Sequence, residues 1–265
     1  MKKKAVAVVM TAVMALGMVS AVSVQAGIED KTLIVGFDAE YPPYGYMDEN
    51  GEYTGFDLEL AQAVCDLEGW ELEKKPINWD SKDMELNSGS IDCIWNGFTM
   101  NGREDDYTFS EPYVDNSQVI VVADDSGIEK LTDLAGKTVG VQAASAALDL
   151  LQSEEEGGQK ELADTFGALN EFADYNTAFT ELQAGALDAL AIDVGVAKYQ
   201  LNSRGEGFKI LDETLNTEQY AIGFKKGNTE LRDKVNADIK KLYEDGTVTK
   251  LAEKYGIDDM ICLGE

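Results

Sequence analysis

An arginine and an aspartate stand just beyond two apolar runs that read as strands. Arg103 follows the predicted strand over residues 91–97 in a polar, turn-rich segment, and Asp193 is the first charge after the run over residues 189–192. A buried carboxylate is best paired with a guanidinium group, and a buried ammonium group with a carboxylate. These two residues therefore predict a site that could hold both charged ends of a free amino acid.

Other residues near the ends of predicted elements could complete this site. Thr99 supplies a hydroxyl group, and the small residues around Ala146 would let a ligand approach the backbone N–H groups where a helix begins. Aromatic faces suit the carbon skeleton of an amino acid, and the chain offers them at Tyr41, Tyr44 and Trp79. The sequence thus provides a partner for each part of such a ligand.

The stretch over residues 33–64 indicates how one corner of the site would form. A strand of buried type ends at Asp38, and a rigid Tyr-Pro-Pro-Tyr corner follows at residues 41–44. Gly-Phe-Asp at residues 55–57 then opens a helix, in which we expect Asp57 to be a helix cap rather than a ligand contact. In open α/β sheets ligands bind beyond the carboxyl ends of the strands, which is where this corner places Asp38.

Arg103 and Asp193 could each have a purely structural role instead of a role in ligand binding. Arg103 could pair with the acidic residues directly after it, over residues 104–106. Asp193 could cap the helix that is predicted to begin near residue 195. The sequence leaves these alternatives open.

Composition excludes several other kinds of site. The chain has no histidine, which removes His-based triads and His-bound zinc, and it has no nucleotide-binding glycine motif. The loop that opens at Asp48 lacks the glycine that a calcium-binding EF-hand needs, so we predict a plain hairpin turn there. We expect no metal and no cofactor.

A net charge of −28 argues against nucleic acid and anionic lipid as partners.

The first 26 residues are typical of a cleaved export signal. Three lysines precede a long apolar stretch that ends in a Val-Gln-Ala cleavage site. An uncleaved membrane anchor is the alternative, although small and hydroxyl residues dilute the run, and no cysteine follows it to carry a lipid.

Three cysteines cannot all pair within the chain, and we expect Cys65 and Cys93 to be small core residues.

Strand and helix patterns alternate along the chain, which is typical of βαβ units and mostly parallel sheets. The predicted strands cover residues 32–38, 71–78, 91–97, 118–123, 138–142, 171–175, 189–193 and 219–224. The predicted helices cover residues 57–68, 84–88, 146–154, 177–184, 195–201, 229–244 and 248–255, with Thr247 as the cap of the last one.

The α/β pattern falls into two similar sets, which predict two doubly wound lobes without a flexible linker between them. The first lobe would be discontinuous, with residues 27–115 and 219–265, and the second would comprise residues 116–218. Two hinge strands, near residues 113–117 and 216–220, would join them.

Several motifs carry a resemblance to a known family. They are the corner over residues 38–44, GFDLELAQAV from Gly55, IDCIWNGFTM from Ile91 with Arg103, YTFSEPY from Tyr107, LTDLAGKTVGVQ from Leu131, GALDALAIDV from Gly185 and DGTVTKLAEKYG from Asp245. Over essentially all of the sequence after the signal, the chain resembles the periplasmic solute-binding proteins of ATP-driven importers for polar amino acids, such as glutamine- and lysine/arginine/ornithine-binding proteins. The resemblance implies a type II periplasmic-binding-protein fold, whose lobes close on the ligand.

The same resemblance implies a role for each candidate residue. Arg103 would clamp the ligand carboxylate and Asp193 would accept the ammonium group. Thr99, Gly97 and Ala146 would add polar or backbone contacts.

Three further residues would contact the rest of the ligand. Tyr41 and Trp79 would form an aromatic sandwich, and Asp38 would read the far end of a lysine, arginine or glutamine side chain. The segment between Thr99 and Arg103 is one residue shorter than usual in the family, which affects how far the arginine reaches.

Together these observations predict a monomeric receptor in the periplasm or at the cell exterior. It would capture a polar L-amino acid, with a cationic or amide side chain favoured, and deliver it to the permease subunits of an ABC importer by lobe closure. The alternative is an enzyme on the same fold, a dehydratase of the cyclohexadienyl type. That chemistry needs a general acid, for which Glu40 or Asp38 could serve, because no histidine exists and no lysine falls among the predicted cleft residues.

Overall fold

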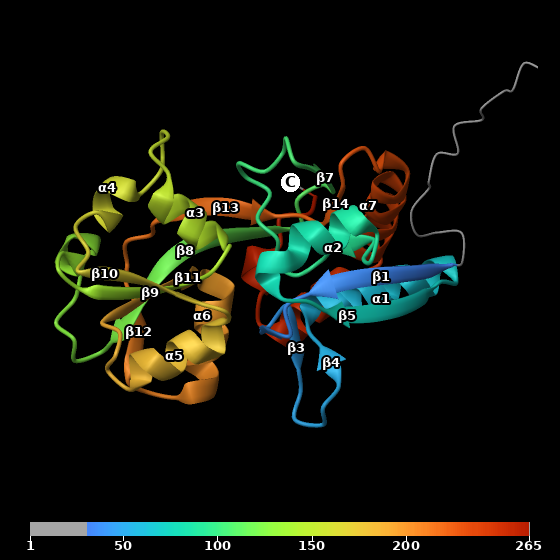
Figure 1. Cartoon of the computed structure of the whole chain (residues 1–265). Coiled ribbons are helices and arrows are strands. Elements are labelled where there is room, and N and C mark those ends of the chain that lie inside the picture. Colours follow the sequence, from blue (N-terminus) through green and yellow to red (C-terminus); the bar gives the residue numbers. More distant parts are fainter. Residues whose placement is uncertain (1–30, 265) are drawn as a thin grey trace, which may run out of the picture.

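The computed structural model describes residues 31–264, whose main strands form two separate sheets (Figure 1). The first sheet has the order β5-β1-β6-β14-β7, and its strands are β1 (Thr32–Phe37), β5 (Glu71–Pro76), β6 (Cys93–Ile94), β7 (Tyr107–Phe109) and β14 (Gly223–Lys225). The second has the order β10-β9-β11-β8-β12, with β13 also paired to β8. Its strands are β8 (Val114–Ala123), β9 (Thr138–Gln142), β10 (Ala168–Phe172), β11 (Ala189–Asp193), β12 (Phe208–Ile210) and β13 (Asn216–Tyr220).

Helices pack against both sheets, as expected for two α/β lobes. They are α1 (Phe56–Glu68), α2 (Lys82–Ser88), α3 (Ala146–Gln152), α4 (Lys160–Ala163), α5 (Tyr175–Gln183), α6 (Val194–Arg204), α7 (Thr229–Glu244) and α8 (Thr247–Tyr255). Short 3₁₀ turns cover Trp79–Ser81, Leu131–Leu134 and Asp258–Met260. A small hairpin sheet of β2 (Glu40–Tyr41), β3 (Gly45–Met47) and β4 (Tyr53–Thr54) carries the predicted turn, in which the Asp48 carboxylate accepts the N–H groups of Asn50 and Glu52.

The sheets are mixed, which corrects the expectation of mostly parallel strands. β1 runs parallel to β5 and β6, and β9 runs parallel to β10 and β11. However, β14 is antiparallel to both of its neighbours, and β8 is antiparallel to β11 and β12. These antiparallel strands adjoin the crossings between the lobes, where the chain enters a sheet from the opposite direction.

Two antiparallel strands connect the lobes. β8 and β13 pair along their length, from Asn216 opposite Gln118 to Tyr220 opposite Val114, and both run between the lobes (Figure 1). The predicted hinge positions fall on this ribbon. The lobe limits at residues 115/116 and 218/219 stay a prediction.

Some predicted elements differ from those observed. The strand expected at residues 171–175 begins at Ala168, and Tyr175 instead opens α5, which Asp174 caps by accepting the N–H of Thr177. The strand expected at residues 219–224 is divided between β13 and β14. Thr247 is the first residue of α8, because Gly246, in a left-handed conformation, takes the N-cap position.

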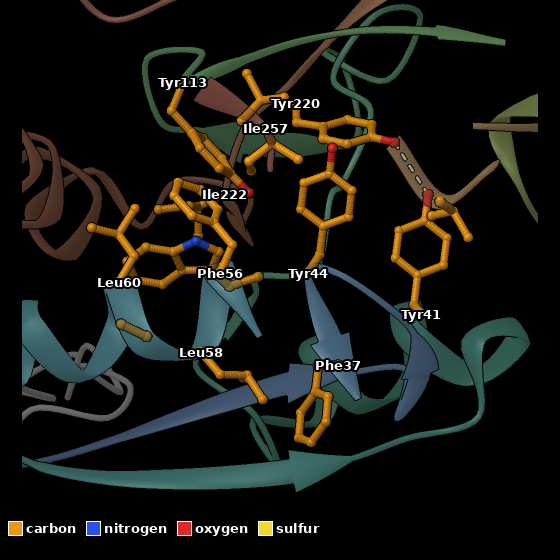
Figure 2. Close-up of a cluster of buried hydrophobic side chains, with 14 of the residues drawn as sticks. Phe37, Tyr41, Tyr44, Phe56, Leu58, Leu60, Tyr113, Tyr220, Ile222 and Ile257 are labelled. Carbon is orange, nitrogen blue, oxygen red and sulfur yellow. Dashed lines mark hydrogen bonds between the residues drawn. The ribbon is translucent and has the colours of Figure 1, made fainter. Parts of the chain in front are cut away.

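The carboxyl-terminal helices complete the first lobe. α7 and α8 pack against α1, and apolar residues of these helices share one core with the first sheet. Figure 2 shows the α1 side chains of this core, with Phe37 of β1. Cys65 and Cys93 are fully buried free thiols in this core, which confirms the sequence-based expectation. Within residues 31–264, every helix is too short or too polar to cross a bilayer. The predicted export signal lies outside the described residues.

A buried carboxylate ties the start of α1 to the loop after β6. Asp57 is completely buried and accepts hydrogen bonds from the Gly97 N–H group at 2.6 Å and from the Tyr113 hydroxyl at 2.8 Å. The N-cap position belongs to Gly55, so the expectation that Asp57 caps this helix is wrong. Burial raises the pKa of Asp57 to about 7, although both of these donors favour the charged form. Its role is to hold Gly97 in place.

Replacing Asp57 tests this contact. Asp57→Ala should destabilise the protein by about 1–3 kcal/mol, because the buried Gly97 N–H loses its partner. Asp57→Asn keeps an acceptor and removes a carboxyl whose folded pKa is raised. A carboxyl group whose pKa is higher in the folded than in the unfolded chain stabilises the fold less as pH rises from the unfolded-state pKa to the folded-state pKa. The free energy of unfolding of wild type should therefore fall relative to that of Asp57→Asn between pH 4 and pH 7. Urea unfolding at several pH values measures both effects, and a pH-independent difference would contradict the assignment.

Candidate functional site

A small pocket, with a volume of about 280 Å³ including solvent, lies between the two lobes. We call it the inner pocket. Its lining residues come from the segments that follow β1, β5 and β6, from the end of β9 and the start of α3, and from the end of β11: Tyr41, Trp79, Asn96, Gly97, Thr99, Arg103, Gln142, Ser145, Ala146 and Asp193. The carboxyl ends of the strands in both sheets therefore meet at one place, as the strand-end rule predicts.

Arg103 lines the inner pocket from the first lobe. Its Nη2 atom pairs with the Oδ2 atom of Asp149, on α3 of the second lobe, at 2.7 Å. The guanidinium carbon lies 5.1 Å from the ring centroid of Phe98. The arginine side chain is only 13% exposed, whereas that of Asp149 is 62% exposed. The structure thus pairs Arg103 across the cleft and not with the acidic residues directly after it.

Asp193 lines the same pocket from the second lobe. Its Oδ1 atom accepts hydrogen bonds from the Tyr220 hydroxyl at 2.7 Å, from Asn116 Nδ2 at 2.8 Å and from Gln118 Nε2 at 2.6 Å. The residue occupies the N-cap position of α6, but its side chain makes no capping hydrogen bond. The carboxylate is therefore directed to the hinge and the pocket, in contrast to the capping alternative.

Backbone geometry positions the neighbouring polar groups. Gly97 adopts a φ of 57°, and a Cβ atom there would lie 2.9 Å from the Tyr220 ring and 3.0 Å from the Tyr41 ring. The Thr99 hydroxyl donates to Glu218 Oε1 at 2.8 Å. Ala146 is the first residue of α3, which Ser145 caps. All three predicted contacts, Gly97, Thr99 and Ala146, line the inner pocket.

Only two of the three predicted aromatic residues line the inner pocket. Tyr41 and Trp79 line the inner pocket, and the Tyr41 hydroxyl lies 3.2 Å from that of Tyr220 (Figure 2). Tyr44 does not line this pocket. It is fully buried, packs edge-on against Tyr220 at a centroid distance of 5.2 Å and leaves no room for a side chain at Gly195 of the second lobe. Tyr44 therefore belongs to the interface between the lobes rather than to the pocket wall.

A second, more open pocket adjoins the first. This outer pocket has a volume of about 1350 Å³ including solvent, and six carboxylate side chains line it: Asp38, Glu40, Asp80, Glu85, Glu171 and Asp174. Trp79 lines both pockets. The described residues that line the outer pocket include no lysine or arginine. The outer pocket is therefore strongly acidic.

Asp38 lines the outer pocket and not the inner one. Its Oδ2 atom accepts a hydrogen bond from Nε2 of Gln142, an inner-pocket residue of the second lobe, at 2.7 Å. Burial raises the pKa of Asp38 to about 6, while hydrogen bonds from the Glu40 N–H and from Gln142 favour the charged form. Asp38 and Gln142 thus meet at the boundary between the two pockets.

Several site residues were missed by the sequence analysis. Asn96, Gln142 and Ser145 line the inner pocket, while Asn116, Gln118, Glu218 and Tyr220 support Asp193 and Thr99 from the hinge. The run of polar residues NSQ at residues 116–118, directly before the apolar run over residues 119–123, is the signal that could have indicated the hinge group.

A buried lysine also lies in the cleft. The Lys82 amine is 5.3 Å from the ring centroid of Trp79 and donates to the Ala144 carbonyl of the other lobe at 3.2 Å. Burial and the charge of Arg103 lower its pKa. The sequence analysis did not consider Lys82, which lines neither the inner nor the outer pocket. Its contact with the second lobe joins the two sides of the cleft.

The described residues contain no cluster of Cys, Asp and Glu side chains arranged to hold a metal ion. The groups that line the inner pocket are instead a guanidinium group, a carboxylate, two side-chain amides, hydroxyl groups and aromatic rings. This set suits a small organic molecule that carries both signs of charge.

Known proteins share both the sequence and the fold. The chain is 30% identical over 255 residues to the L-cystine-binding protein TcyJ of Escherichia coli K12, covering 92% of each chain. It is 34% identical over 229 residues to the arginine-binding extracellular protein ArtP of Bacillus subtilis, covering 85% of this chain and 86% of the relative.

Solved structures extend the comparison. A substrate-binding protein of an ABC uptake transporter from Streptococcus pneumoniae, solved with bound histidine, superposes with a TM-score of 0.82 at 34% identity, covering 88% of this chain and 95% of the other. An ancestral amino acid-binding protein, a precursor of cyclohexadienyl dehydratase, superposes with a TM-score of 0.76 at 32% identity, covering 85% and 95%.

These structural neighbours confirm the predicted type II periplasmic-binding-protein fold with two α/β lobes. Residues 33–258 match the bacterial extracellular solute-binding proteins, family 3. The match covers nearly all of the described residues, including both lobes and the hinge. The chain therefore belongs to family 3 of the bacterial extracellular solute-binding proteins.

Proposed function

We propose that this protein captures a free L-amino acid between its lobes and presents it to an ABC importer. The observation that carries the proposal is that Arg103 and Asp193, from opposite lobes, line one small pocket. A guanidinium group and a carboxylate on opposite walls suit the two charged ends of a zwitterion. The relatives whose names record cystine, arginine or histidine as ligands support this class of ligand.

The contacts of both residues favour a ligand that brings its own charges. Asp149 is largely exposed, so its ion pair with Arg103 is screened by solvent and weak. A ligand carboxylate inside the pocket can replace it at Arg103. The ammonium group would lie at Asp193, while Tyr41 and Trp79 contact the carbon skeleton.

The outer pocket supports a cationic side chain over an amide. A long side chain that passes Trp79 would enter a space lined by six carboxylates. Asp38 stands at its inner end, 93% buried and without an ion pair among the described residues. An arginine, lysine or ornithine side chain would balance this charge, whereas a second carboxylate would be repelled.

Contacts between the lobes support capture by closure. Gln142 donates to Asp38, Lys82 donates to the Ala144 carbonyl, and Arg103 pairs with Asp149, each bond joining one lobe to the other. A ligand that bridges the same two walls stabilises the closed arrangement, and the hinge ribbon absorbs the movement. The closed, liganded form would be the one that the permease subunits bind.

The remaining parts of the proposal follow the family. The protein would be exported by its amino-terminal signal to the periplasm or the cell exterior, and it would act as a monomer without a cofactor. Catalysis of the dehydratase kind is the alternative, but no carboxyl among Asp38 and Glu40 lines the inner pocket. We therefore propose binding without chemistry.

Removing the guanidinium group tests the carboxylate clamp. Arg103→Ala should weaken amino acid binding by about 3–5 kcal/mol, because a ligand carboxylate would be buried without its partner, which is a loss of roughly two to four decades in affinity. Isothermal titration calorimetry measures the loss. Arg232→Ala is a matched control, since Arg232 pairs with Asp233 on the surface of the first lobe. Equal affinity of Arg103→Ala and wild type would remove Arg103 from the site.

A ligand screen tests the preference for positive charge. Among the twenty amino acids, ornithine and cystine, the cationic ones should raise the melting temperature most. A ligand at about 100 times its dissociation constant stabilises by about 2.7 kcal/mol, or roughly 5–10 °C for a chain of this size. A largest shift with glutamate or aspartate would refute the preference.

The carboxylate of Asp38 can be tested with the same ligands. Asp38→Asn should weaken L-arginine binding by about 1.5–3 kcal/mol and change L-glutamine binding little, because only the charged side chain loses an ionic partner. Asp92→Asn is the control, since Asp92 is a buried carboxyl that binds the Ile34 N–H group away from both pockets. Equal losses for both ligands would place Asp38 in a structural role.

A further inference from the structure

The hinge strand β13 carries a buried carboxylate that contacts the inner pocket through one hydrogen bond. Glu218 is 6% exposed, and its Oε1 atom accepts from Thr99 Oγ1, Asn116 Nδ2 and Gln118 Nε2, each at 2.8 Å. Thr99 lines the inner pocket, whereas Asn116 and Gln118 belong to the other hinge strand, β8. Glu218 thus connects the pocket wall to the hinge.

A second carboxylate shares the same donors. The Nδ2 atom of Asn116 and the Nε2 atom of Gln118 each donate to both Glu218 Oε1 and Asp193 Oδ1. Within residues 31–264 neither carboxylate forms an ion pair with a lysine or arginine. Two carboxylates in such a site repel each other, so that one of them binds a proton more readily than usual.

We propose that Glu218 holds a proton while the cleft is empty and releases it when the ammonium group of a ligand settles against Asp193. This inference rests on the proposed function and adds a participant to it. Burial, followed by the charge of Asp193, raises the pKa of Glu218 to about 7, so the residue is partly protonated near neutral pH. An ammonium group beside Asp193 cancels much of that charge and lowers the pKa again.

The structure also provides a place for the proton and a route to solvent. The Oε1 atom takes all three donors, and no hydrogen bond to Oε2 is found among the described residues, so Oε2 can carry the proton. Glu218 lines an open pocket on the far side of the hinge, with a volume of about 1110 Å³ including solvent. The proton can therefore leave without crossing the ligand.

Other titratable and charged groups surround Glu218. On the cleft side they are Asp193, Tyr44, Tyr175, Tyr220 and Arg103, and around the far pocket they are Asp115, Lys198 and Asp259. Burial raises the pKa of the three tyrosines, so they remain neutral. Lys198 and Asp259 pair with each other at 3.1 Å. Asp193 is the carboxylate that shares donors with Glu218, so the ligand contact at Asp193 has the largest influence.

The sign of the pH dependence follows from linkage. If the pKa of Glu218 is lower with ligand than without it, binding releases a proton, and affinity rises with pH between the two pKa values. The slope can reach at most tenfold in affinity per pH unit for one proton. The pH dependence should vanish when the carboxyl group is replaced by an amide, which does not titrate.

Calorimetry in buffers of different ionisation enthalpy tests this inference, with L-arginine and L-glutamine as probes. At pH 7 wild type should release a measurable fraction of one proton in binding L-glutamine, and Glu218→Gln should release none. L-Arginine, which also contacts Asp38 in the proposed function, should show a smaller release in Glu218→Gln than in wild type. Asp92→Asn, which removes a buried carboxyl away from the pockets, should release as many as wild type. Infrared difference spectra of wild type should show loss of a protonated carboxyl band on binding, which tests the inference even if Glu218→Gln does not fold.

Binding by wild type without proton release would overturn this inference alone. Release that persists in Glu218→Gln but disappears in Asp38→Asn would also overturn it, because the proton would then come from the outer pocket. Failure of wild type to bind any of the twenty amino acids would remove the proposed function and this inference with it.

Discussion

A carboxylate buried without a cation is the constraint on which the cleft depends. Asp193 is held by the hydroxyl groups of Tyr220 and Tyr175 and by two amides, which solvate its charge but do not cancel it. Glu218 accepts hydrogen bonds from the same two amides, so Asp193 shares its amide donors with a second buried carboxyl group at the hinge. The protein is thus built with an unbalanced charge at the point where its lobes meet. A positively charged group that enters the inner pocket completes the arrangement.

The hinge is therefore part of the site and not only a connector. β8 and β13 place Asn116 directly opposite Glu218, and the polar side chains of this ribbon contact Asp193 at the end of β11 and Thr99 in the loop after β6. Any rotation of one lobe against the other must change these hydrogen bonds. Under the proposed function, ligand binding and lobe movement would act on the same few side chains, which would link occupancy to closure.

The sequence was sufficient where one strong physical rule applied. Arg103 and Asp193 were expected near strand ends, and both line the inner pocket, while their contacts with a ligand stay a prediction. α7 was predicted with its observed bounds because its apolar stripe is long and regular. Tyr44 was misplaced because an aromatic residue at a corner can point either way, and packing against Tyr220 decides. Glu218 was missed because its partners come from distant segments. β10 was shifted by three residues because its half-exposed sequence shows no clear alternation.

The order of strands in the first sheet has a consequence for how the chain is made. β14 lies between β6 and β7, and α7 and α8 cover α1, although all three elements come from the last part of the sequence. The strands of the second sheet, by contrast, form one continuous stretch from β8 to β13. When synthesis proceeds from the amino terminus, the second lobe has all its strands while β6 and β7 still expose unpaired edges to neighbouring chains. The first sheet can thus be completed only after every strand of the second has been made.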